Sequence, residues 1–136
     1  MPLQLAYRSY SRPFRIPLHT AHGRWIERTG LIVRIQNEYG QVGYGEIAPL
    51  PWFGSETLEM AIARCDQLIT QVPPPTLRSL QMLPATHPAC QFGWATAIAW
   101  LEQQPSWPRA PLPPARSCIL LPTGLTALAS WAPVSY

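Results

Sequence analysis

Prolines divide this chain into a few segments, because 17 of them occur among its 136 residues. Proline lacks an amide proton and its ring clashes with the preceding helical turn, so a helix ends where prolines accumulate. The run Pro73-Pro74-Pro75 therefore ends any helix before it and predicts an extended path. Residues 102–116 (EQQPSWPRAPLPPAR) contain five more prolines and predict a linker.

The first third of the chain predicts a small antiparallel sheet of about three strands. Residues 31–36 (LIVRIQ) are rich in β-branched side chains, residues 37–40 (NEYG) supply turn chemistry, and residues 42–48 resume an extended pattern. These segments predict a hairpin with a loop of about four residues. Leu3–Tyr7 and Phe14–Pro17 predict one or two earlier strand pieces.

An amphipathic helix is predicted between this sheet and the triple proline. Ser55 can cap its first turn, and Glu56 and Glu59 lie near its positive end. Apolar residues then recur at spacings of three and four, which is the period of one helix face. They are Leu58, Ala61, Ile62, Cys65, Leu68 and Ile69.

A second helix is predicted from near Pro88 to about Gln104, since proline suits a first helical turn. Its apolar positions are Phe92, Ala95, Ile98, Ala99 and Leu101. Residues 117–122 (SCILLP) then resemble the first strand of a new domain with no sheet to join. The order of strands, helices and a further strand predicts the α+β class. We expect a first domain over residues 1–104, a proline-rich linker over 105–116 and the start of a truncated domain over 117–136.

Charged residues are scarce in this chain. Hydrophobic residues make up 47% of it and charged residues 12%, so part of its surface is expected to be covered. The ten basic residues are all arginines, scattered from Arg8 to Arg116, and this scatter argues against a nucleic-acid partner. The lack of lysine excludes Schiff-base and ammonium chemistry from this chain.

The cysteines, the N-terminus and two uncharged stretches indicate the cellular compartment of the protein. Cys65, Cys90 and Cys118 are odd in number and widely spaced, which favours buried free thiols in a reducing cytoplasm over a disulfide framework or a zinc site. The N-terminus shows no signal-peptide pattern. Residues 79–101 and 117–136 lack formal charge, but prolines and polar side chains interrupt both, so we expect no membrane span. These features predict a cytoplasmic protein.

Few side chains are grouped as a catalytic site requires. Glu46 has no partner acid, base or metal ligand nearby in the sequence, which favours a structural role over a catalytic one. His19 and His22 lie three residues apart without an acid or a cysteine beside them, so no metal site is expected. No nucleophile-elbow, P-loop or dinucleotide motif occurs. A bulge or a close backbone approach is predicted for the glycines Gly40, Gly43 and Gly45.

The connection between the sheet and the first helix is apolar. Residues 49–53 read PLPWF, whereas such connections are usually short and polar. Trp25 lies in a second predicted loop, Thr20–Trp25. These aromatic side chains either pack against their own domain or belong to two loops, Thr20–Trp25 and Pro49–Gly54, that together roof an apolar pocket.

Five segments carry a family resemblance: FRIPL at residues 14–18, TAHGRW at 20–25, RTGLIVRI at 28–35, GYGEIAPLPWFGSETLE at 43–59 and HPACQFGWATAIAWLE at 87–102. In this order they resemble the N-terminal capping domain of the o-succinylbenzoate synthase family, in the enolase superfamily. The resemblance covers about residues 3–124. One departure is Phe53-Gly54-Ser55, which replaces a tighter Phe-Ser spacing.

The resemblance implies a two-domain enzyme in which an α+β cap precedes a modified (β/α) barrel. In that family the barrel carries two catalytic lysines and three acidic Mg²⁺ ligands, and the enzyme is a Mg²⁺-dependent carbon–oxygen lyase, a dehydratase. It converts 2-succinyl-6-hydroxy-2,4-cyclohexadiene-1-carboxylate to 2-succinylbenzoate on the route to menaquinone or phylloquinone. The racemase and cycloisomerase chemistries of sister families stay open, because the barrel residues that decide between them are absent here.

A complete barrel needs about 250 residues, so it is essentially absent from this chain. Without a barrel and without lysine, the chain alone is expected to be inactive, with no catalytic residue and no metal ligand of its own. Mg²⁺ is implied for the intact enzyme only. The expected partner is a small-molecule substrate.

The two predicted loops are the part of the cap that the resemblance places against substrate, with Arg24 as the candidate contact for a carboxylate. The expected substrate-binding residues are Thr20, His22, Gly23, Arg24, Trp25, Pro51, Trp52 and Phe53. Two alternatives use the same features. A stand-alone protein-interaction module would bind a protein through the apolar loops, and a non-functional truncated product would leave them open to aggregation.

Overall fold

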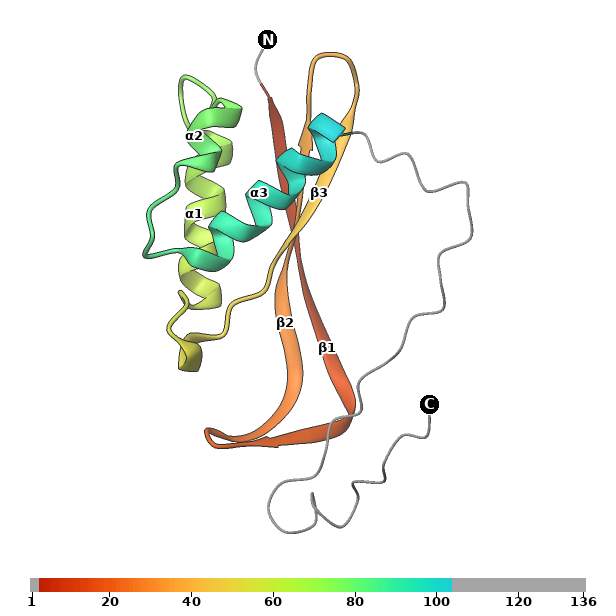
Figure 1. The fold of residues 1–136 in the computed structure, drawn as a ribbon, viewed down its shortest axis with the longest axis vertical. Coiled ribbons are helices and arrows are strands. Elements are labelled where there is room, and N and C mark those ends of the chain that lie inside the picture. The colour runs from red at the N-terminus through yellow and green to blue at the C-terminus, as the bar shows by residue number, and fades with distance from the viewer. Residues whose placement is uncertain (1–2, 104–136) are drawn as a thin grey trace, which may run out of the picture. The chain divides into compact units, whose positions relative to one another are not determined.

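The described part of the chain forms a three-stranded antiparallel sheet with helices on one face, as the α+β prediction requires (Figure 1). The computed structural model describes residues 3–103, so the predicted linker and the predicted second domain lie outside the described residues. The strands are β1 (Gln4–Thr20), β2 (Gly23–Gln36) and β3 (Val42–Ile47), in the order β1-β2-β3. A 3-10 turn η1 (Pro51–Phe53) follows, and then the helices α1 (Leu58–Thr70), α2 (Leu77–Gln81) and α3 (Pro88–Gln103).

Strands β1 and β2 form one long hairpin, where the sequence predicted shorter pieces. Their pairing runs from Gln4 opposite Gln36 to Thr20 opposite Gly23, with an irregularity between Pro13 and Leu18. The prolines of β1 are accommodated because β1 is an edge strand. The predicted loop Thr20–Trp25 is therefore wrong as a loop: it is the tip of this hairpin, whose turn residues are 21 and 22.

The core lies between the sheet and the helices. Alternate residues of β2 are fully buried there, as expected for a strand with one covered face. The core comprises Leu31, Val33, Ile35, Ile47, Ala61, Cys65, Leu68, Leu80, Leu83, Cys90, Trp94, Ala97, Ile98 and Leu101. Cys65 and Cys90 are buried free thiols, as predicted, and Cys118 lies outside the described residues.

Helix α3 approaches β3 unusually closely, because glycines face each other across the contact. A Cβ atom added at Gly45 would overlap the carbonyl oxygen of Gly93, and one at Gly43 would overlap that of Ala97. The predicted close backbone approach at these strand glycines is confirmed. The pairing of β2 with β3 runs without a bulge, and Gly40 lies in the preceding turn with a φ of 76°.

This contact also decides which face of α3 is buried. Of its apolar positions, Ile98 and Leu101 are buried, whereas Phe92 is 69% exposed and Ala95 also faces solvent. Trp94 is the buried aromatic residue instead. The small residues Gly93 and Ala97 lie against the glycines of β3.

The capping of the helices differs from the prediction. Thr57, not Ser55, caps α1, since its side chain accepts a hydrogen bond from the amide of Met60. Ser55 instead accepts a hydrogen bond from the amide of Leu50 at 2.6 Å. Glu56 is buried and accepts hydrogen bonds from residues 89 and 90, so it serves the N-terminus of α3 rather than that of α1.

Helix α2 was not predicted, and it begins in a capping box between Thr76 and Ser79. Among residues 3–103, no helix has both the length and the apolar character needed to cross a membrane.

Candidate functional site

The tip of the β1–β2 hairpin bends back toward the turn η1, so two segments far apart in the sequence lie together (Figure 1). The tip is closed locally. The hydroxyl of Thr20 donates to the carbonyl oxygen of Gly23 at 2.9 Å and accepts from the amide of His22 at 3.2 Å. Gly23 has a φ of 113°, which favours glycine at this position.

Aromatic contacts join the tip to η1. The rings of Trp25 and Trp52 meet edge to face with centroids 5.3 Å apart, and those of His22 and Phe53 lie 5.9 Å apart. The ring of Phe14 in β1 also meets that of Trp25 edge to face, with centroids 4.9 Å apart. Such edge-to-face pairs add to the stability gained by burial alone. The two predicted loops are thus brought into contact.

A hollow of about 90 Å³ lies at this junction and is lined by Thr20, His22, Gly23, Arg24, Trp25 and Trp52. Of the remaining predicted residues, Phe53 touches His22 and Pro51 opens the turn η1. Pockets for small molecules usually measure about 300–1,000 Å³. This hollow is therefore too small to be a complete small-molecule pocket by itself.

Several apolar side chains near this hollow are exposed to solvent. Phe53 is 76% exposed and Trp52 is 38% exposed, and the strand residues Ile16 and Ile26 are also exposed. Packing within the described residues thus does not bury this end of the domain.

Sequence reasoning missed Arg28, which lies in β2 beside this junction. Its guanidinium donates hydrogen bonds to the carbonyl oxygens of Ala48 at 2.6 Å and Pro49 at 3.2 Å, and it lies 5.5 Å from the ring centroid of Trp25. No local sequence signal marks this residue, because its hydrogen-bond partners are 20 and 21 positions away.

Glu46 contacts a side chain of its own sheet. The hydroxyl of Tyr10 donates a hydrogen bond to its carboxylate. Burial, then that hydrogen bond and the charge of Glu46, raise the pKa of Tyr10 to about 12. Within residues 3–103, no three His, Cys, Asp or Glu side chains are placed to hold a metal ion.

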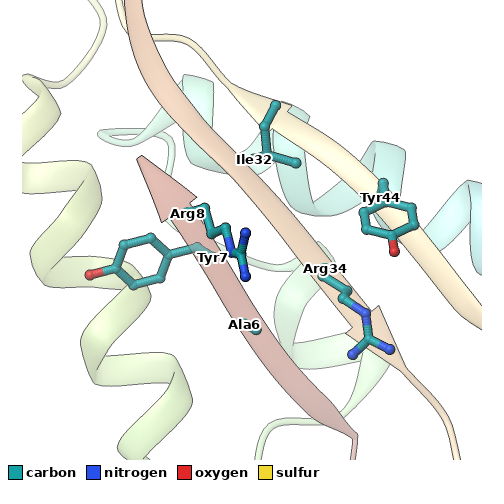
Figure 2. A pocket seen from close by; sticks show the side chains of 6 residues that line it. All are labelled: Ala6, Tyr7, Arg8, Ile32, Arg34 and Tyr44. Carbon is teal, nitrogen blue, oxygen red and sulfur yellow. The ribbon is translucent and has the colours of Figure 1, made fainter. Parts of the chain in front are cut away.

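A second hollow, of about 450 Å³, is lined by residues of all three strands of the sheet (Figure 2). Ile32 and Arg34 point into it and alternate along β2 with core residues, so it lies on the face away from the helices. Its other lining residues are Ala6, Tyr7, Arg8 and Tyr44. None of the predicted site residues contributes to it.

Comparison with known proteins identifies relatives of this chain. Residues 4–101 match the family described as MenC, N-terminal domain. The chain is 44% identical over 129 residues to an o-succinylbenzoate synthase of Thermosynechococcus vestitus, covering 92% of the chain and 37% of that protein. It is 36% identical over 98 residues to an o-succinylbenzoate synthase of Yersinia enterocolitica, covering 69% of the chain and 28% of that protein. The chain thus spans about a third of the length of these relatives.

Solved structures agree with the sequence comparison. The o-succinylbenzoate synthase of Thermosynechococcus elongatus BP-1, complexed with Mg in its active site, matches with a TM-score of 0.72 at 41% identity, covering 94% of this chain and 38% of that one. A dipeptide epimerase of Enterococcus faecalis matches with a TM-score of 0.65 at 22% identity, covering 76% and 32%. The second likeness shows the shared fold alone.

Proposed function

The chain belongs to the MenC N-terminal domain family, and from this we propose that it is the capping domain of an o-succinylbenzoate synthase. The observation that carries the proposal is the match of residues 4–101 to this family, together with 44% identity to one such synthase over 129 residues. The intact enzyme would dehydrate 2-succinyl-6-hydroxy-2,4-cyclohexadiene-1-carboxylate to 2-succinylbenzoate. It would act in the cytoplasm, in menaquinone or phylloquinone biosynthesis.

The junction between the hairpin tip and η1 is the proposed contribution of this domain to the substrate site. Its hollow is small and its apolar side chains are open, which suits one wall of a pocket whose other wall lies outside residues 3–103. A wall of this kind would exclude water and hold the substrate. Arg24 lines the hollow and is the proposed contact for a substrate carboxylate.

The metal and the proton-transferring groups are proposed to lie elsewhere in the intact enzyme. A solved relative is complexed with Mg in its active site, and this supports Mg²⁺ as the metal of the intact enzyme. The residues described here do not fit that role, because they place no set of three potential ligands together. The chain also contains no lysine. We therefore expect the 136-residue chain alone to be inactive.

Two measurements test the proposal. The first is the intact mass of the protein in its native source, compared with the 15.2 kDa of this chain. The second is turnover of the cyclohexadiene substrate by the full-length protein with added Mg²⁺. A mass well above 15.2 kDa together with dehydratase activity would support the proposal. A longer protein that instead racemises or cycloisomerises a related acid would refute the reaction while keeping the fold.

The exposed apolar residues of η1 also favour a second candidate, a protein-interaction module. A native mass of 15.2 kDa and a monodisperse protein would support this alternative. A native protein of that mass that aggregates would instead indicate a non-functional truncated product.

A further inference from the structure

Arg28 occupies a position from which one side chain reaches both segments of the proposed substrate wall. It lies in β2, and pairing between β2 and β3 ends with Leu31 opposite Ile47. The chain beyond Ile47 therefore leaves the sheet, and the carbonyl oxygens of Ala48 and Pro49 lie past the last pair. The guanidinium of Arg28 donates to both, at 2.6 and 3.2 Å. It thus holds the backbone that leads directly into η1.

The same guanidinium also contacts the hairpin tip. Its central carbon lies 5.5 Å from the ring centroid of Trp25, within the range of a cation–π contact. Trp25 in turn meets Trp52 of η1 edge to face at 5.3 Å. Arg28 therefore contacts both segments: it binds the backbone that precedes η1, and it contacts the indole of Trp25, against which Trp52 of η1 packs.

Arginine suits this position for a physical reason. The planar guanidinium presents several N–H donors at fixed angles. One guanidinium can therefore donate hydrogen bonds to two carbonyl oxygens and also contact an aromatic face. Lysine carries a compact charge on a flexible stem and lacks that fixed fork. The side chain of Arg28 is also partly buried, which strengthens its hydrogen bonds relative to those of an exposed arginine.

We propose that Arg28 is a positioning residue that fixes the hairpin tip and η1 relative to each other as one wall of the substrate site. It acts through Trp25 and the backbone of residues 48–49, not by touching the substrate. The contacts stand independently of any activity, whereas the effect on catalysis rests on the proposed function.

The structural half of the proposal is tested on the 136-residue chain carrying 5-fluorotryptophan. Fluorine NMR resolves the tryptophans individually, and substitution of each one assigns its signal. Arg28→Ala is expected to shift or broaden the signals of Trp25 and Trp52 and to leave that of the fully buried Trp94 in place. Arg64→Ala is the control, because the solvent-exposed hydrogen bond of Arg64 is to Gln67 of its own helix.

The catalytic half is tested on the full-length protein. Arg28→Ala is expected to raise KM for the cyclohexadiene substrate about tenfold with a smaller change in kcat, because a displaced wall weakens binding in both the ground state and the transition state. Arg28→Lys should recover part of the loss, since it keeps the charge and can serve one carbonyl oxygen. Arg64→Ala should leave both constants unchanged.

The outcomes separate the two claims. Unchanged signals of Trp25 and Trp52 in Arg28→Ala would overturn the positioning role, whatever the enzyme does. Shifted signals with unchanged KM and kcat in an active full-length protein would overturn its catalytic consequence. An inactive wild-type full-length protein with shifted signals in the variant would refute the proposed function and leave the structural role of Arg28 supported.

Discussion

Single residues set the distance between α3 and the sheet. Gly45 and Gly43 face the backbone of α3 so closely that neither leaves room for a Cβ atom. The obstacle is a carbonyl oxygen of a helix backbone, which cannot rotate away as a side chain can. A methyl group at either strand position must therefore displace the whole helix.

We expect Gly45→Ala to lower the free energy of unfolding by about 3 kcal/mol, the upper range of overpacking costs. Gly40→Ala is the matched control: no atom lies closer than 4.0 Å to its new Cβ, and only the φ of 76° opposes it. Its loss should be about 1 kcal/mol. Urea denaturation of the 136-residue chain gives both values, and equal losses would contradict the close-approach explanation.

Tyr10 gives the domain a predicted pH dependence. Its pKa is raised from 10.0 to about 12, first by burial and then by the hydrogen bond to Glu46. The folded state holds this proton more tightly than the unfolded chain. The stabilisation is therefore fully present below pH 10 and is lost as the pH rises through about 12.

The urea midpoint of the wild-type chain should fall between pH 10 and about 12, and Tyr10→Phe should lack that part of the fall. Tyr39→Phe should retain it, because Tyr39 is 80% exposed and lies in the β2–β3 turn. Coincident profiles for the wild type and Tyr10→Phe would rule out Tyr10 as the titrating group.

At the scale of elements, one carboxylate connects two helices. Glu56 lies just before α1, yet it accepts hydrogen bonds from the amides of Ala89 at 3.1 Å and Cys90 at 2.6 Å in the first turn of α3. Those amides have no partner within the helix, and a negative charge is favourable at this end of a helix dipole. Glu56 therefore holds the segment between η1 and α1 against α3.

Replacing Glu56 by Ala should lower the free energy of unfolding by about 1–3 kcal/mol, because one buried and one partly buried amide lose their acceptor. Glu56→Gln should cost less, since one side-chain oxygen remains. Glu59→Ala is the control on the same helix end, because Glu59 is exposed, and its loss should be smaller. Chemical denaturation measures all three, and a loss from Glu59→Ala as large as that from Glu56→Ala would refute the cap assignment.

Two equally exposed tryptophans lie in different parts of the described residues. Trp52 belongs to the junction between η1 and the hairpin tip. Trp100 lies near the C-terminal end of α3 and packs against Tyr44, with ring centroids 6.1 Å apart. Both tryptophans are 38% exposed, so they form a matched pair. Only the first lies in the proposed substrate wall.

In the full-length enzyme we expect Trp52→Ala and Arg24→Ala each to lower kcat/KM about tenfold or more, the loss that follows when a wall contact or a charged hydrogen bond is removed. Trp100→Ala should lower stability to a similar degree as Trp52→Ala while leaving kcat/KM near the wild-type value. Unchanged turnover in both Trp52→Ala and Arg24→Ala would refute the assignment of this wall.

Local sequence patterns predicted the α+β class, the β2–β3 hairpin and the positions of α1 and α3. These features depend on hydrophobic period, turn residues and prolines, which act between neighbours in the chain. Tertiary structure decided the rest: the continuation of β1 through Pro13, the burial of Trp94 in place of Phe92, and the partners of Glu56 and Arg28. Those outcomes join residues up to 34 positions apart. They depend on how closely the backbones pack, and no local pattern encodes that distance.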